Sequence, residues 1–341
     1  MQTTTFAQAE TPPDSSRTTA SIDQVHLTFG GRDWRLVIDK ALVPFVREIL
    51  SLDSAAINPD CLAPAETMRI RLAGPDERAL WQARHASQAG TNAMAIVQFS
   101  DEAHHLGRLS SVSCELEGPS GLEWIWLEAP ERLLTLGGAI LLNAWLRRWH
   151  ANWIPVHAAA IGRDGRYVLV PGAGGAGKST LSAAALAAGW EVMADDFAWL
   201  LTRKNSVTVE SPYATLRLTS DAREQIQVHW PEWRPAARCD QRGDGKWVSA
   251  EACTHQTGLL CGILRLQPDT HSGAVQTLPS NRALLPEFRT SHFLLHQSGA
   301  DSNGYMGALC NALQGIPAGT LPRGPNLAEN LANIEQWLNQ I

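Results

Sequence analysis

The sequence lacks long apolar segments and dense runs of one charge. No stretch reaches the roughly 18 consecutive apolar residues of a membrane-spanning helix, and the first residues lack the basic start and apolar run of an export signal. Only 18% of the 341 residues are charged, and the net charge of −6 arises from scattered side chains. Without a basic stripe, we expect no nucleic-acid partner and no membrane partner, and we expect a cytoplasmic protein.

Cysteine is sparse and irregularly spaced. The 6 cysteines form no C-x-x-C pair, which favours reduced thiols over a disulfide framework. Cys253, His255 and Cys261 lie close in sequence, but no fourth ligand stands at an interval typical of zinc sites. We therefore prefer thiols to a metal site in this segment.

Composition and pattern predict a tail, two domains and a bridging helix. Residues 1–21 are rich in Thr, Ser, Pro and Gln and predict a flexible tail. Residues 22–130 hold short alternating segments and one segment with helical spacing, which predict a small, mostly β, α+β domain. Residues 131–150 place leucines on one side and end in basic residues, as a bridging helix would. Residues 151–341 are expected to form an α/β domain.

The C-terminal segment predicts a helix that packs on this second domain. Its apolar residues recur at helical spacing, which places them on one face. They are Leu327, Leu331, Ile334, Leu338 and Ile341.

The most informative stretch is GAGGAGKST, which contains the phosphate-loop pattern G-x-x-x-x-G-K-[ST]. It follows the apolar segment RYVLVP and precedes an Ala- and Leu-rich segment, so the strand, loop and helix that the pattern requires are present. We expect its backbone N–H groups and the helix N-terminus to bind nucleotide phosphates. The predicted nucleotide-binding residues are Gly172, Ala173, Gly174, Gly175, Ala176, Gly177, Lys178, Ser179 and Thr180. Lys178 is expected to reach the β- and γ-phosphates, and the Ser179 hydroxyl is expected to bind Mg²⁺.

The segment before the loop predicts a hairpin that carries a histidine to the loop. Two apolar runs flank residues 162–165, whose sequence GRDG is typical of a turn between antiparallel strands. With Ile161 opposite Arg166, the register places His157 opposite Val170, next to the start of the loop. We expect the His157 side chain to contact a phosphate or the substrate.

Two adjacent acids follow the loop after one helix and one short strand. Asp195 and Asp196 end the apolar segment EVMA, which we expect to be a neighbour of the loop's own strand. One carboxylate would bind Mg²⁺ and the other would accept a proton from an attacking hydroxyl. The residues alone leave open which aspartate takes which role.

His157, the loop and the aspartate pair together resemble the C-terminal domain of HPr kinase/phosphorylase and its kinase-like relatives, over residues 150–202. The resemblance implies a mixed sheet similar to that of phosphoenolpyruvate carboxykinase, and transfer of the γ-phosphoryl group of ATP to a serine of a small protein or peptide. It implies that Asp195 and Ser179 bind the metal and that Asp196 is the catalytic base, although the roles of the two aspartates could be exchanged. It also implies that His157 lies near the transferred phosphate and that Lys178 acts in catalysis. Arg242 and Lys246 are candidates for a later basic segment of the family.

The sequence departs from the bifunctional HPr enzymes in two places. Its N-terminal unit differs from theirs, and its loop ends in Ser-Thr where theirs commonly end in Ser-Glu. It is more similar to HPr-kinase-related proteins of natural-product peptide pathways, some of which phosphorylate a precursor peptide. The resemblance therefore implies an ATP- and Mg²⁺-dependent serine kinase. A phosphoserine phosphorylase or phosphatase, a small-alcohol kinase, a non-catalytic nucleotide-binding module and homo-oligomerisation stay open.

Overall fold

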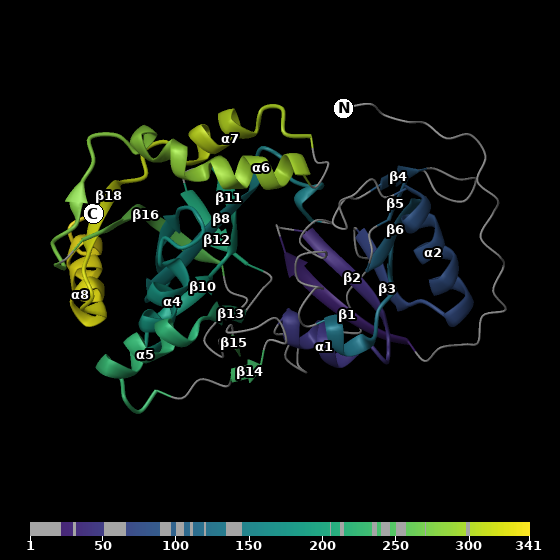
Figure 1. Ribbon diagram of the computed structural model, residues 1–341. Helices are drawn as coiled ribbons and strands as arrows, with labels where there is room; N and C mark the ends of the chain where they lie inside the picture. Colours follow the sequence, from purple (N-terminus) through teal and green to yellow (C-terminus); the bar gives the residue numbers. More distant parts are fainter. Residues whose placement is uncertain are drawn as a thin grey trace. The chain divides into compact units, whose positions relative to one another are not determined.

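A computed structural model of the chain describes most residues, and it divides them into two compact units (Figure 1). One unit comprises Met1–Glu48 and Leu52–Gly137, and the other Ile49–Ser51 and Gly138–Ile341. The described residues are 22–29, 32–50, 66–88, 97–99, 106–109, 112–118, 121–133, 145–204, 206–211, 215–233, 237–239, 246–249, 257–269, 271–297 and 301–341.

The first unit is built on a mixed sheet, which in the described residues has the strand order β1-β2-β3-β7-β6-β5-β4. β3 pairs in parallel with β2 and β7, and the other pairs are antiparallel. The strands are β1 (Ile22–Phe29), β2 (Arg32–Asp39), β3 (Glu66–Leu72), β4 (Val97–Phe99), β5 (Leu106–Leu109), β6 (Ser113–Gly118) and β7 (Gly121–Trp126). The helices are α1 (Val43–Ile49), α2 (Pro75–Gln88) and the 3-10 turn η2 (Pro130–Arg132).

Alternating apolar residues bury the faces of this sheet. Trp34, Leu36 and Ile38 of β2 are at most 1% exposed, as the two-residue period of a strand predicts. α2 packs through its buried Trp81 against a cluster that includes Cys114 and Ile125. This helix was not predicted, because its charged and polar residues give it little apolar periodicity.

The second unit contains a mixed sheet whose pairings close into a ring. β8 pairs with β9, β9 with β16, β16 with β12, β12 with β11, and β11 with β8 again. β16 runs parallel to β9 and β18, so the carboxyl ends of these three strands lie at one edge. The strands are β8 (Trp153–Arg163), β9 (Arg166–Pro171), β10 (Glu191–Ala194), β11 (Phe197–Arg203), β12 (Ser206–Glu210), β16 (Gly258–Pro268), β17 (Gln276–Thr277) and β18 (Ala318–Arg323).

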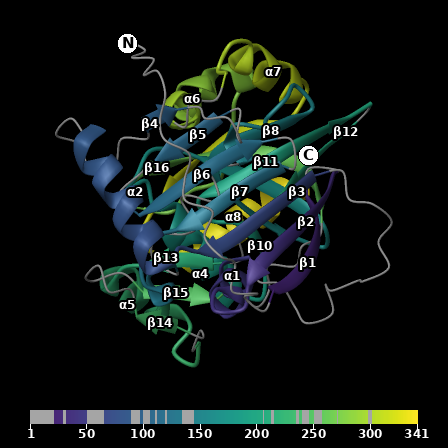
Figure 2. The same cartoon turned by 90° about the vertical axis from the view of Figure 1, so that its right-hand side faces the viewer.

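Helices of the second unit form two groups. α4, α5 and α8 contact one another and share an apolar core with β9, β16 and β18. α6 and α7 contact β8, and both views show them side by side (Figures 1 and 2). The helices are α4 (Lys178–Ala187), α5 (Ser220–His229), η3 (Asn281–Phe288), α6 (Arg289–Gln297), α7 (Tyr305–Ala312) and α8 (Leu327–Leu338). A smaller sheet has the order β13 (Thr215–Leu218), β15 (Lys246–Ser249), β14 (Ala237–Cys239).

The C-terminal helix forms where it was predicted. The Asn326 side chain caps α8 by accepting from the Glu329 N–H. Four of the five predicted apolar residues are buried, but Ile341 is 39% exposed because the helix ends at Leu338.

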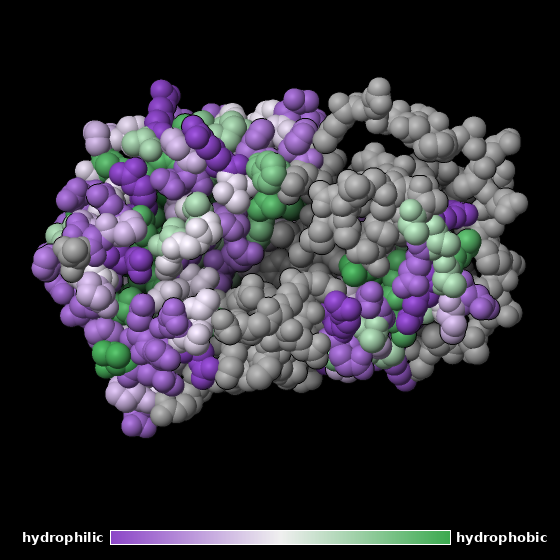
Figure 3. All heavy atoms as spheres, viewed as in Figure 1, coloured by the Kyte–Doolittle hydropathy of each residue, from purple (hydrophilic) through white to green (hydrophobic). Residues whose placement is uncertain are grey.

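Several predictions fall outside the described residues. These are the tail at residues 1–21, residues 134–144 of the bridging helix, Arg242, Cys253 and His255. In the part of the chain that is described, no helix has the length and apolar character to cross a membrane. The face of the second unit in Figure 3 is largely hydrophilic.

Candidate nucleotide site

The loop Gly172–Gly177 connects β9 to α4, as the sequence predicted. Three of its glycines have left-handed φ values: 147° at Gly172, 81° at Gly175 and 93° at Gly177. Glycine adopts these values without the Cβ clash of other residues, so the sequence permits this path of the chain. Gly177 stands at the N-cap position of α4 and offers no side-chain acceptor to the first turn. The free N–H groups of that turn can therefore bind an anion.

Lys178 folds back over the loop. Its side chain is buried, and Nζ donates to the carbonyl oxygens of Gly172 at 2.8 Å and Ala173 at 3.2 Å. Burial lowers the pKa of Lys178, and the negative charges of Asp196 and Asp195 oppose this effect. The lysine and both predicted acids are thus close enough to interact electrostatically.

The aspartate pair lies between β10 and β11, two strands that both pair with the same edge of β8. Ala194 pairs with Ala160 and Phe197 with His157, so the two aspartates lie where β10 ends and β11 begins. The two aspartates have different environments. Asp195 is 8% exposed, whereas the Asp196 side chain is 73% exposed.

His157 contacts the exposed aspartate. Its Nε2 lies 2.9 Å from Asp196 Oδ1. Ser291 of α6 accepts from the His157 backbone N–H at 2.8 Å, and the Phe197 ring packs edge-on at 5.5 Å between centroids. Nδ1 is buried and has no hydrogen-bond partner among the described residues. Phe197 and Asp196 therefore contact the ring, while Ser291 of α6 binds the backbone of His157.

The hairpin register differs from the prediction by two residues. Gly162 and Arg163 belong to β8, and the turn consists only of Asp164 and Gly165, with φ of 53° and 73°. These values fit the two-residue turns that Asp-Gly favours, because they match the twist of paired strands. Ala159, not His157, pairs with a residue of the loop strand at Val170. The shift is an even number, so each side chain keeps its predicted face, and His157 lies just beyond the last pair, Ala158 with Pro171.

The neighbour predicted for the acids was wrong. The strand before Asp195 pairs with β8 and not with β9, so β8 lies between the aspartates and the loop strand. The acids still interact electrostatically with Lys178, although β8 lies between their strand and the loop strand.

The structure thus brings His157, Lys178, Asp195 and Asp196 together, while other assignments stay predictions. Ser179 and Thr180 lie half-buried in the first turn of α4. Lys246 lies in β15, and its side chain is outside the described residues.

Three residues at the site were missed by sequence reasoning. Ser291 accepts a hydrogen bond from the backbone N–H of His157. A methyl group at Gly177 would lie 2.8 Å from Cζ of Arg323, and one at Gly172 would lie 3.9 Å from Oε2 of Glu287. Arg323 ends β18, so recognising that parallel strand would have placed it at the loop edge. Its sequence AGTLPR hides the strand, since Gly and Pro are rare in strand interiors.

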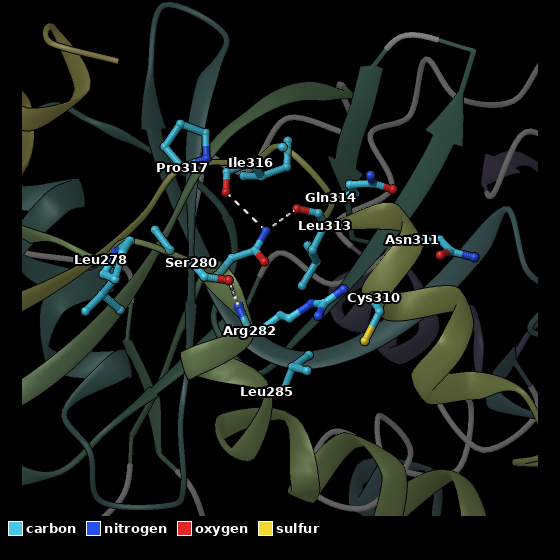
Figure 4. A pocket seen from close by; sticks show the side chains of 14 residues that line it. Leu278, Ser280, Arg282, Leu285, Cys310, Asn311, Leu313, Gln314, Ile316 and Pro317 are labelled. Carbon is cyan, nitrogen blue, oxygen red and sulfur yellow. Dashed lines mark hydrogen bonds between the residues drawn. The ribbon is translucent and has the colours of Figure 1, made fainter.

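A pocket of about 450 Å³ lies on other residues of the second unit (Figure 4). Its lining comes from η3, the end of α7 and the segment before β18, and none of the loop residues contributes. Asn281, one of the lining residues, donates to the carbonyl oxygens of Leu313 and Ile316. The pocket is therefore distinct from the loop site.

The chain matches no protein-family model and no curated protein sequence. Among solved structures it is similar to the Hpr(Ser) kinase/phosphatase from Coxiella burnetii, with 14% identity over 55% of this chain and 99% of that chain, and a TM-score of 0.29. A likeness of this degree establishes neither the fold family nor the activity of this chain. The mixed sheets themselves agree with the α/β class predicted from sequence.

Proposed function

We propose that the chain is an ATP- and Mg²⁺-dependent phosphotransferase that transfers the γ-phosphoryl group to a serine hydroxyl of a peptide or small protein. One observation carries the proposal: an exposed carboxylate, Asp196, is held by His157 beside a glycine-rich loop with a buried lysine. A module that only binds nucleotide has no need of such a carboxylate.

The donor atoms fit both nucleotide and metal. The uncapped first turn of α4 and Lys178 supply N–H groups for phosphate oxygens. Asp195 and Ser179 offer hard oxygen ligands of the kind that magnesium prefers. When bound, the metal would neutralise phosphate charge. On ATP binding, we expect the Lys178 ammonium to exchange its two loop carbonyls for phosphate oxygens.

Asp196 is positioned to act as the base. Its exposure leaves room for an acceptor, and His157 fixes one of its oxygens. In the proposed step, Asp196 takes the proton of the acceptor hydroxyl, the oxygen forms a bond to the γ-phosphorus, and the bond from that phosphorus to the β,γ-bridging oxygen breaks. The products are a phosphoester and ADP. General-base catalysis of this kind contributes about 10²–10⁴-fold in rate.

The choice of a peptide acceptor rests on the sequence resemblance of His157, the loop and the aspartate pair. The test is incubation of the chain with ATP labelled in the γ-phosphate, Mg²⁺ and a panel of serine-containing peptides and small proteins, followed by detection of phosphoserine.

The decisive variant is Asp196→Asn. We expect turnover to fall by about 10²–10⁴-fold, with ATP affinity nearly unchanged, because the amide cannot accept the proton. Asp164→Asn is the matched control, since Asp164 lies exposed at the far end of the β8–β9 hairpin. Full turnover in Asp196→Asn would remove the assigned base.

A further inference from the structure

Arg323 lies against the nucleotide loop although it is 145 residues downstream of Lys178 in sequence. It ends β18, whose carboxyl end meets that of β9 at the same sheet edge through β16. If a Cβ is placed on Gly177, it comes within 2.8 Å of Cζ, 3.0 Å of Nη1 and 3.2 Å of Nε of Arg323. The guanidinium therefore packs directly on the residue that precedes α4.

One donor of the guanidinium is unsatisfied among the described residues. Its Nε is buried without a hydrogen bond. By contrast, Arg163 of the same unit pairs with Glu335 at 2.7 Å, and Arg265 donates to Thr320. A buried donor without an acceptor is costly, so such a group usually has a partner.

The location makes this arrangement costly unless an anion binds. The N-terminus of a helix carries partial positive charge, which disfavours a nearby cation. Here two cations, Lys178 and Arg323, lie at the same N-terminus. Asp195 and Asp196 interact electrostatically with Lys178. A polyphosphate would satisfy both cations and the helix N-terminus together.

We propose that Arg323 is a nucleotide-binding residue that donates to the phosphates of ATP and supplements Lys178. The proposal rests on the nucleotide binding in the proposed function and extends it to a strand that the loop motif does not include. A Cβ at position 177, where φ of 93° already favours glycine, would also meet the guanidinium.

Binding measurements on the full chain test the proposal. ATP, ADP, adenosine and inorganic tripolyphosphate are titrated calorimetrically into the wild type, Arg323→Ala, Arg323→Lys and the control Arg163→Ala. For Arg323→Ala, we expect ATP and tripolyphosphate affinities to fall by about ten- to a hundredfold, as expected for a lost charge-assisted hydrogen bond. Adenosine affinity and the Arg163→Ala titrations should not change.

Two further readouts separate a phosphate contact from mere packing. The loss in Arg323→Ala should shrink at high salt, because the lost interaction is electrostatic. Arg323→Lys should restore only part of the affinity, since an ammonium cannot replace a planar guanidinium with several fixed donors. Equal losses for adenosine and ATP, or wild-type ATP affinity in Arg323→Ala, would overturn the proposal.

The outcome is independent of the kinase assignment. If the wild type binds ATP but phosphorylates no acceptor, the proposed transfer fails while the binding result still decides the role of Arg323. If the wild type transfers phosphate and Arg323→Ala binds ATP equally well, only the arginine proposal fails.

Discussion

The contact between His157 and Asp196 gives the sharpest test of the site, because it predicts a large effect on turnover and a small one on stability. The perturbation is a double-mutant cycle of His157→Phe and Asp196→Ala. Phenylalanine keeps the ring that packs against Phe197 and removes both ring nitrogens. Alanine removes the carboxylate without touching the core, because the Asp196 side chain is 73% exposed.

The expected magnitudes follow from burial. A pair with one exposed member is screened by water, so we expect a coupling free energy of unfolding of about 0.2–1 kcal/mol despite the 2.9 Å separation. His157→Phe also removes Nδ1, a buried atom with no hydrogen-bond partner among the described residues. A buried polar atom without a hydrogen-bond partner lowers the free energy of unfolding by about 1–3 kcal/mol, so its removal should offset the loss of the contact with Asp196.

The assay pairs urea unfolding of the wild type and three variants with turnover measured on the same preparations. Each single variant should lower turnover by at least about tenfold, and the double variant should be no worse than Asp196→Ala, because residues that act as a unit are non-additive. Stabilities should agree to within about 1 kcal/mol with unchanged denaturant dependence.

One result would refute this reasoning. A coupling free energy above about 2 kcal/mol together with unchanged turnover would show that the pair is a structural ion pair of the kind found in buried sites. The aspartate would then have no catalytic role.

Two further predictions concern residues near the site, Tyr305 and Gly177. Tyr305 is buried and its hydroxyl donates to the Pro155 carbonyl at 2.8 Å, so Tyr305→Phe should lower the free energy of unfolding by about 1–3 kcal/mol. Burial raises the pKa of the Tyr305 phenol. The free energy of unfolding of the wild type should therefore fall above a pH of about 10, because the tyrosine ionises in the unfolded chain but not in the folded one. Tyr305→Phe should lose less stability between pH 8 and pH 11, as measured by unfolding at both pH values. Gly177→Ala should lower both the melting temperature and ATP affinity, because alanine is strained at φ of 93° and its Cβ would meet Arg323. Gly174→Ala, at an open position without a positive φ, is the stability control, and an equal melting temperature for both variants would contradict the strain argument.

Local features of the site were predictable because they depend on neighbours in sequence. The glycines, Lys178 and the strand and helix around them follow from backbone freedom, apolar patterning and the loop motif. The α8 helix followed in the same way from its apolar face. The Asp-Gly pair by itself indicates a two-residue turn, whereas the predicted four-residue turn at residues 162–165 displaces the register by two residues.

Contacts across the fold were not predictable by these means. Ser291 meets His157 across 134 residues of sequence, and nothing in the segment around Ser291 indicates a strand-end partner. The same holds for Glu287, which lies in a 3-10 segment beside Gly172. Such contacts depend on which faces of distant elements pack together, and short-range periodicity contains no information about that choice.

The sequence by itself therefore determined that a glycine-rich loop joins a buried strand to a helix, and that a histidine and two acids lie near it. Only the tertiary structure decided which of the two acids is exposed. It also decided that β8 lies between the acids and the loop strand, and that Arg323 packs against the loop. The reason is physical: torsion preferences and side-chain period act within a few residues, whereas burial and charge proximity arise only when the sheet closes.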